Sequence, residues 1–272
     1  MSEVILVVLW RPEAAAGLLR EAGCLAGLAG GARINALAVQ APLGLTAFMA
    51  DGSVPEAILE RLSAEERDRV ARLKTVFDGW AAGAGEACRS AQWCSVEENP
   101  EAAVEERGRR ADFILVARPT ADDDWPVRQA FHAALFRTDR PILVVPPNPP
   151  SGFGRRIAIA WRDDRRAAKA VLPALRSLAR AERVHLLCGF RQGAAPPGLP
   201  GILLEHGIRA EPHLLPIGPG PFGESLLAEA HRLGCDLLVM GAYAHSELRE
   251  MILGGVTRFM LTHADLPVLM RH

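Results

Sequence analysis

Residues 241 to 257 contain the residue types and spacing that would hold a phosphate group. Gly241 follows an apolar run, Gly254 and Gly255 stand where the last helical segment begins, and Thr257 follows two residues later. Glycines at a helix start leave backbone N–H groups unobstructed by a Cβ atom, and the helix dipole adds partial positive charge. Thr257 adds a hydroxyl donor. The spacing indicates a phosphate cradle, and an ordinary glycine turn without a ligand is the alternative.

Such a cradle needs a sheet that brings distant segments together. The sequence contains two sets of segments that could each form such a sheet. Residues 4–9 and 156–160 are apolar runs, each followed by Trp-Arg and then by an Ala-rich helical stretch. Two later pairs of segments correspond in the same order, residues 111–116 with 235–240 and residues 140–144 with 266–270. A repeat of this length indicates two copies of one unit.

The elements alternate between short apolar strands and helices, which predicts parallel sheets covered by helices on both faces. The Pro- and Gly-rich segment 146–152 separates the copies. We therefore expect an α/β fold of two tandem doubly wound domains, residues 1–150 and 151–272. In such sheets, ligands bind beyond the strand ends, between the first and fourth strands. In the second copy this point carries Trp161 and Arg162 on one side and Met240 and Gly241 on the other.

The first copy is longer, through an insert at about residues 40–85. The segment Ser63-Ala64-Glu65-Glu66 has the pattern of a capping box and predicts a helix that starts there, with Val70, Leu73 and Phe77 on one face. A packing role over the sheet is the simpler interpretation of this insert. A role in covering a ligand is the alternative.

The sequence resembles the universal stress proteins in their tandem-domain form, and the resemblance covers nearly the whole chain. Nucleotide-binding members carry Gly-x2-Gly-x9-Gly-Ser/Thr after the fourth strand, and here the pattern is Gly241-x2-Ala244-x9-Gly254-Gly255. The resemblance implies an adenine-nucleotide alpha-hydrolase-like fold, with five strands per domain in the order 3-2-1-4-5. It also implies phosphate contacts at Gly241 and Gly254, with Met240 near the adenine or ribose.

Three positions depart from the family pattern. Ala244 replaces a glycine, and Gly255 replaces the hydroxyl residue, which removes one hydrogen bond worth about 0.5–1.5 kcal/mol. Many members also carry an aspartate after the first strand, where this chain has Arg162 followed by Asp163. Asp163 is a candidate replacement by a one-residue shift, and Arg162 a candidate phosphate contact. Solvated charges are the alternative for both.

The first copy lacks the glycine cradle. Its fourth strand is followed by Arg118 and by Asp122, Asp123 and Asp124, which we interpret as a solvated acidic loop that repels phosphate. This copy therefore has a structural role. The resemblance also implies that the last strands of the two copies pair antiparallel, so that one chain imitates a dimer, and a homodimer of the chain remains open.

Composition narrows the remaining classes of function. A formal net charge of −1 and interleaved basic and acidic residues argue against nucleic-acid binding. No apolar run is long enough for a membrane span, and the first residues are typical of a strand rather than a secretion signal. Five cysteines at irregular spacing suit a reducing cytoplasm, with Cys188 and Cys235 as core residues. The eight histidines show no zinc-site spacing, so no metal ligands are predicted.

These observations favour a non-enzymatic cytoplasmic stress-response protein that binds ATP or AMP in its second domain as a sensor. Mg²⁺ is expected only together with a nucleotide. The alternative is an interaction scaffold whose site is closed by the changes at Ala244, Gly255 and Arg162. A slow ATPase ranks last, because no base that would activate water is recognisable.

Overall fold

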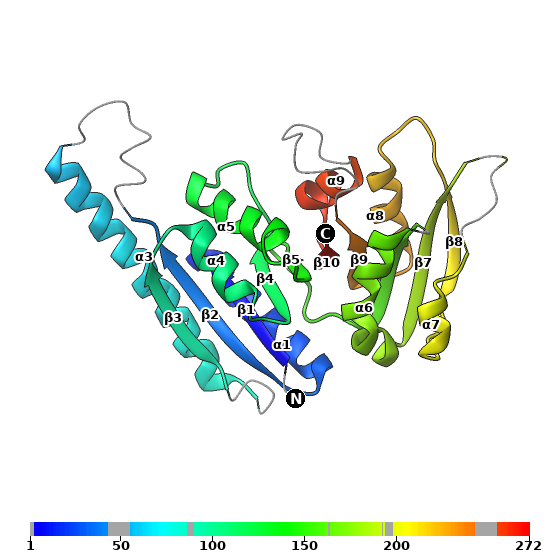
Figure 1. The fold of residues 1–272 in the computed structure, drawn as a ribbon, viewed down its shortest axis with the longest axis horizontal. Helices are drawn as coiled ribbons and strands as arrows, with labels where there is room; N and C mark the ends of the chain where they lie inside the picture. The colour runs from blue at the N-terminus through cyan, green and yellow to red at the C-terminus, as the bar shows by residue number, and fades with distance from the viewer. Residues whose placement is uncertain are drawn as a thin grey trace. The chain divides into compact units, whose positions relative to one another are not determined.

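Short runs rich in Val, Ile and Leu form the strands in both halves of the chain, and Ala- and Leu-rich segments form the helices between them (Figure 1). The computed structural model describes residues 3–42, 55–85, 90–162, 164–191, 193, 198–242 and 255–272. The chain divides into two compact units, residues 1–140 and 141–272. The expectation of a domain boundary near Pro150 remains a prediction.

Strands and helices alternate throughout the first unit. Its elements are β1 (Glu3–Leu9), α1 (Pro12–Ala29), β2 (Ala32–Gln40), α3 (Glu56–Gly83), β3 (Gln92–Glu97), α4 (Pro100–Gly108), β4 (Phe113–Ala117) and α5 (Trp125–Phe136). Strand β1 pairs in parallel with β2 and with β4, and β2 pairs in parallel with β3. Such parallel pairing requires the crossover helices that the alternating pattern predicts.

The second unit repeats this plan after one additional strand. Its elements are β5 (Ile142–Val145), β6 (Arg156–Trp161), α6 (Arg165–Arg180), β7 (Arg183–Phe190), α7 (Gly201–Glu205), β8 (Glu211–Pro216), α8 (Phe222–Arg232), β9 (Leu237–Gly241), α9 (Gly255–His263) and β10 (Val268–Arg271). The strand order is β3-β2-β1-β4-β5 in the first half of the chain and β8-β7-β6-β9-β10 in the second. Both are the order 3-2-1-4-5, so the predicted doubly wound α/β fold is confirmed.

The last strands of the two repeats pair with each other within the second unit. Strands β5 and β10 are antiparallel, with Val144 opposite Val268 and Ile142 opposite Met270. All four residues of β5 are buried. The expected antiparallel pairing is therefore present, and it gives the apolar strand β5 a partner on the side that would otherwise be open.

A repeated aspartate serves the same purpose in both units. Asp112 accepts a hydrogen bond from the Val4 backbone N–H at 2.8 Å, which ties the approach to β4 to the start of β1. Asp236 accepts hydrogen bonds from the N–H groups of Gly154 and Arg155 at 2.7 and 3.0 Å, just before β6. The duplication extends from the apolar pattern to individual hydrogen bonds.

Helix α3 starts earlier than the capping-box pattern predicted. It begins at Glu56, and Ser63 lies in its interior. The side chain of Glu66, the presumed capping residue, instead pairs with Arg69 at 2.6 Å. Residues 56–62 contain neither glycine nor proline, so the helix continues through them. Leu73 and Phe77 are buried as expected, and α3 packs against α1 and β2.

The two cysteines predicted to lie in the core are buried there. Cys188 is 1% exposed and Cys235 is 8% exposed. Burial raises the pKa of the Cys188 thiol to about 11 and that of Cys235, with Asp236 adding to the effect, to about 12. Both side chains are therefore neutral at physiological pH.

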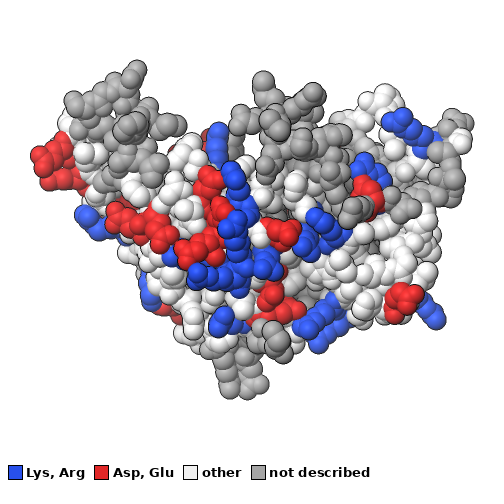
Figure 2. Space-filling model, in the orientation of Figure 1, with Lys and Arg blue, Asp and Glu red and all other residues white. Residues whose placement is uncertain are grey.

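Acidic and basic side chains lie close together on α4 and the residues that follow it, and Figure 2 shows red and blue groups in contact on this face. Arg109 pairs with Glu105 at 2.6 Å, and Arg110 pairs with Glu106 at 3.0 Å. Salt bridges of this kind along a helix pair opposite charges on its surface. Within the described ranges, every helix is too short or too polar to cross a lipid bilayer.

Candidate functional site

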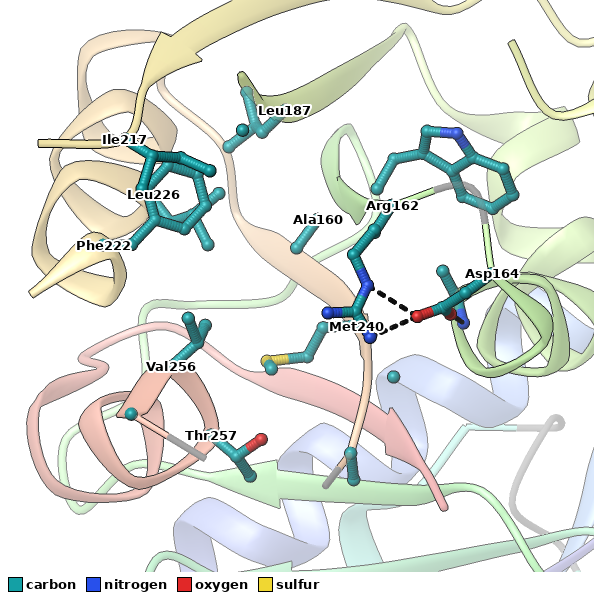
Figure 3. A pocket seen from close by; sticks show the side chains of 16 residues that line it. Ala160, Arg162, Asp164, Leu187, Ile217, Phe222, Leu226, Met240, Val256 and Thr257 are labelled. Carbon is teal, nitrogen blue, oxygen red and sulfur yellow. Dashed lines mark hydrogen bonds and ion pairs between the residues drawn. The ribbon is translucent and has the colours of Figure 1, made fainter. Parts of the chain in front are cut away.

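A pocket of about 330 Å³ opens at the carboxyl ends of β6 and β9, the first and fourth strands of the second repeat (Figure 3). This is the switch point at which doubly wound sheets bind ligands. Its volume lies near the lower end of the range for small-molecule sites. The described lining residues come from three strands, three helices and the segments beside them: Ala160, Trp161, Arg162, Asp164, Ala167, Leu187, Gly189, Ile217, Phe222, Leu226, Met240, Gly241, Ala242, Gly255, Val256 and Thr257.

One side of the pocket is apolar. Figure 3 shows Leu187, Ile217, Phe222 and Leu226 gathered on this side, with Met240 facing them across the cavity. Leu187 is the end of an apolar run in β7, while Phe222 and Leu226 lie one turn apart on α8. A flat heterocycle is suited to such a wall, because it buries two apolar faces there.

The opposite side is formed mainly by backbone and small side chains. Gly241 ends β9 and Ala242 follows it, and Gly255, Val256 and Thr257 form the first turn of α9. A Cβ atom placed on Gly255 would meet no atom of the described residues within 4 Å. The first turn of a helix presents N–H groups and partial positive charge, the properties that bind a phosphate.

Arg162 and Asp164 form an ion pair at the rim. The Nε atom of Arg162 donates to Oδ2 of Asp164 at 2.6 Å, and Nη2 also contacts this oxygen. The second oxygen, Oδ1, accepts the backbone N–H of Ala167 at 2.9 Å and so caps α6. The Arg162 side chain is 68% exposed. It therefore lies at the mouth of the pocket without filling its interior.

Five of the eight residues predicted for the site line this pocket: Arg162, Met240, Gly241, Gly255 and Thr257. Their convergence follows from the adjacency of β6 and β9, which pair in parallel with Ala160 opposite Met240. Thr257 is only 5% exposed, so its side chain belongs to the pocket wall. The other three, Asp163, Ala244 and Gly254, lie outside the described residues.

The apolar wall was not identified from the sequence. Phe222 and Ile217 lie far from the glycine motif in the chain, and their patterns are those of ordinary core residues. One signal was present: Gly189 interrupts the apolar run of β7, and a Cβ atom there would lie 2.7 Å from Cζ of Phe222. A glycine within a strand often marks such a close approach.

The corresponding place in the first unit is occupied by side chains. Arg11, which matches Arg162 in the repeat, pairs with Asp123 at 3.2 Å and donates to the Arg118 carbonyl at 2.7 Å. The side chains of Arg11 and Asp123 are 18% and 3% exposed. The interpretation of a solvated acidic loop is wrong for Asp123, because a neighbouring strand end supplies it with a cation.

Helix α3 adds a second cation at the same place. Arg69 donates hydrogen bonds to the carbonyl groups of Val39, in the last two residues of β2, and of Trp10, just after β1, at 2.7 and 2.8 Å. Its guanidinium lies over the Trp10 ring, 4.6 Å from the centroid. In the second unit, the carboxyl ends of the first and fourth strands border a pocket. At the equivalent place in the first unit, arginine side chains form hydrogen bonds and ion pairs instead.

Comparisons with known proteins agree with this geometry. Residues 217–272 match the model of the universal stress protein family. No curated protein matches the chain. Among solved structures, a universal stress protein from Archaeoglobus fulgidus superposes with a TM-score of 0.72 at 14% identity, covering 100% of this chain and 96% of that one.

Two structures from Pseudomonas aeruginosa are similar over the same length. A functionally unknown protein has a TM-score of 0.58 at 14% identity, covering 99% of this chain and 92% of its own. A putative universal stress protein has a TM-score of 0.58 at 16% identity, with 99% and 93% covered. At such identities these structures show the fold. With the match of residues 217–272 to the family model, they agree with the resemblance of the chain to the universal stress proteins in tandem form.

Proposed function

We propose that the second unit binds an adenine nucleotide, ATP or AMP, and that the protein acts in the cytoplasm as a non-enzymatic nucleotide sensor in a stress response. The observation that carries the proposal is the pocket at the switch point, with an apolar wall facing a backbone wall. The base would lie against Phe222, Leu187 and Met240. The phosphates would lie at Gly241 and the start of α9.

Binding without hydrolysis is favoured by the state of the one carboxylate among the described lining residues, Asp164. Its two oxygens are engaged by the cap on α6 and by Arg162. A hydrolase needs a group aimed at the attacking water or at a metal ion on the phosphates. Mg²⁺ would accompany a nucleotide through the phosphate oxygens.

The first test is the release of bound nucleotide. The purified full-length protein is denatured, and the supernatant is analysed by chromatography and mass spectrometry. Stoichiometric ATP or AMP is expected. Protein that carries none, and whose melting temperature is unchanged in millimolar ATP and AMP, would favour the alternative of a nucleotide-free scaffold.

A gain-of-affinity variant tests the position of the phosphates. Gly255 has open space at its Cβ position and stands where the family pattern has Ser or Thr. G255S should add one hydrogen bond to a phosphate and tighten binding about 2- to 10-fold. The matched control is G201S, because Gly201 also begins a helix, has open space at Cβ and lies outside the pocket lining. Equal affinities of G255S and G201S would place the phosphates elsewhere.

A further inference from the structure

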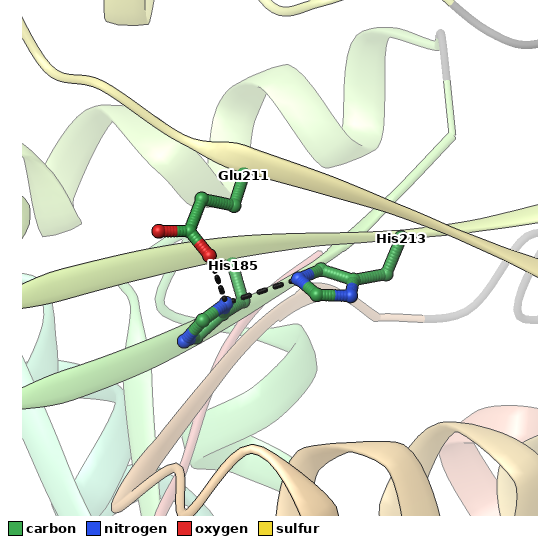
Figure 4. A group of neighbouring side chains, drawn as sticks. All are labelled: His185, Glu211 and His213. Carbon is green, nitrogen blue, oxygen red and sulfur yellow. Dashed lines mark hydrogen bonds and ion pairs between the residues drawn. The ribbon is translucent and has the colours of Figure 1, made fainter.

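Two strands of the second unit bring a group of titratable side chains together outside the nucleotide pocket. His185 lies on β7, directly opposite Glu211 on β8, and His213 follows two residues later on the same face of β8 (Figure 4). One potential ligand atom from each side chain lies within 4.8 Å of the other two. The sequence spacing of these residues matches no zinc motif, because the group assembles across a strand pair.

The distances suit a small divalent metal ion. Nδ1 of His185 lies 3.1 Å from Nε2 of His213 and 3.6 Å from Oε2 of Glu211. In a tetrahedral zinc site with ligand distances near 2.0–2.1 Å, neighbouring ligand atoms lie about 3.3 Å apart. The three ligand atoms all lie within 4.8 Å of one another, and the Glu211 side chain is 57% exposed, so rotation of this side chain can bring its carboxylate onto an ion held by the two histidines.

Surrounding residues orient two of the ligands. Nδ1 of His213 lies 3.4 Å from Oε1 of Glu229 on α8, so the carboxylate favours a proton on Nδ1 and leaves Nε2 as an unprotonated electron-pair donor. Arg183 donates to Oε1 of Glu211 at 3.4 Å, which leaves Oε2 directed toward His185. Histidine oriented by a carboxylate is the usual outer shell of a metal site.

His185 contributes through Nδ1. The residue is 2% exposed, and among the described residues its Nε2 atom has no hydrogen-bond partner. Within the described residues, the polar contacts of this ring are therefore made by Nδ1, the atom that faces Glu211 and His213.

We propose that His185, Glu211 and His213 bind one divalent transition-metal ion, with Zn²⁺ as the best match, on the edge strand pair β7–β8. Two imidazole nitrogens and one carboxylate oxygen are a set that zinc accepts, with water in the fourth position. The Glu211 side chain is 57% exposed, so water and the ion can reach the site. The site is separate from the proposed nucleotide pocket, whose described lining includes none of these three residues.

The test uses full-length protein freed of metal with a chelator and titrated with Zn²⁺ against a chromophoric competitor. Wild type should bind one Zn²⁺ per chain, and Co²⁺ should give the visible absorption of a tetrahedral complex. E211Q and H213Q should each weaken Zn²⁺ binding by at least about 10-fold, and E229Q should weaken it by about 10- to 100-fold, as expected for an orienting residue.

The matched control is H231Q. His231 also faces a carboxylate, Asp265, at 2.6 Å, but it lies outside the cluster, so this variant should bind Zn²⁺ as wild type does. If H213Q does not fold, as judged by circular dichroism, the exposed position of E211Q makes that variant decisive. Wild type that binds no Zn²⁺ at micromolar free concentration, or that is matched by E211Q, would overturn the proposal. Nucleotide titrations of the same variants should be unchanged, which separates this site from the pocket.

Discussion

Asp164 has two roles: its side chain caps α6, and its charge pairs with Arg162 at the rim of the pocket. Two different substitutions separate these roles. D164A removes the acceptor that caps Ala167 N–H at 2.9 Å and also removes the partner of Arg162. D164N keeps an oxygen that accepts the cap and loses only the charge. Asparagine and aspartate are about equally good at this helix position, whereas alanine is poor.

The expected magnitudes follow from these contacts. Loss of the cap costs about 1 kcal/mol. The ion pair contributes about 0.5 kcal/mol, because the Arg162 side chain is 68% exposed. D164A should therefore lower the free energy of unfolding of the second unit by about 1.5 kcal/mol, and its melting temperature by about 3–6 °C. D164N should lower the free energy by only about 0.5 kcal/mol.

The two variants should also change nucleotide affinity in a defined direction. Removing a negative charge from the rim and releasing Arg162 toward the phosphates should tighten ATP binding in D164N by about fivefold, or roughly 1 kcal/mol. Urea denaturation and isothermal titration calorimetry measure the two quantities. The control is D78N, since Asp78 also pairs with a nearby cation, Lys74, but lies in the first unit and caps no helix.

Two results would refute this reasoning. Equal unfolding free energies for D164A and D164N would show that the hydrogen bond to Ala167 is not a stabilising cap. Weaker ATP binding by D164N would show that Asp164 contacts the nucleotide or its metal ion, and is not a repulsive charge at the rim.

Three further predictions concern packing, ionisation and strand pairing. G223V should lower the free energy of unfolding by about 1–3 kcal/mol, as measured by urea denaturation, because a Cβ atom there would lie 2.6 Å from Cβ of Phe259; an unchanged free energy contradicts this contact. The thiol pKa values in the folded protein are about 11 for Cys188 and about 12 for Cys235, whereas a thiol in the unfolded chain has a pKa near 8.5. As pH rises, the unfolded chain therefore loses these protons before the folded protein does. Stability should then fall as pH rises from about 9 to 11, and less steeply when both residues are alanine, as followed by denaturation across that range; parallel profiles would argue against it. A fragment of residues 1–150 should self-associate in sedimentation experiments, since its β5 lacks β10, whereas a strict monomer would show that the exposed strand needs no partner.

Local patterns were sufficient for the architecture. The apolar runs of 4–9 and 156–160 became β1 and β6, and the repeated aspartates before β4 and β9 make the same hydrogen bonds. The doubly wound class and the position of the pocket follow from alternation and handedness, which depend on residues close in sequence, whereas the strand order was implied by the family resemblance. The glycine motif, which is also a local pattern, predicted the residues on one side of that pocket.

The start of α3 shows a limit of local patterns. Ser63 and Glu66 have the types and spacing of a cap, yet they lie inside a helix that begins at Glu56. A capping box stabilises a helix start only if the residues before it are not helical. The preceding residues are compatible with helix, and Leu73 and Phe77 hold the helix against the sheet.

What the sequence by itself determined is a duplicated α/β chain with a glycine-rich candidate site at one switch point. Arg11 and Arg162 occupy equivalent positions in the two repeats, each directly after the tryptophan that follows the first apolar run. Only the tertiary structure decided that their environments differ. Arg11 is held by Asp123 across the strand ends, whereas Arg162 turns back to Asp164, its near neighbour. The reason is physical: an ion pair depends on distances across a sheet, and these are set by packing and not by spacing along the chain.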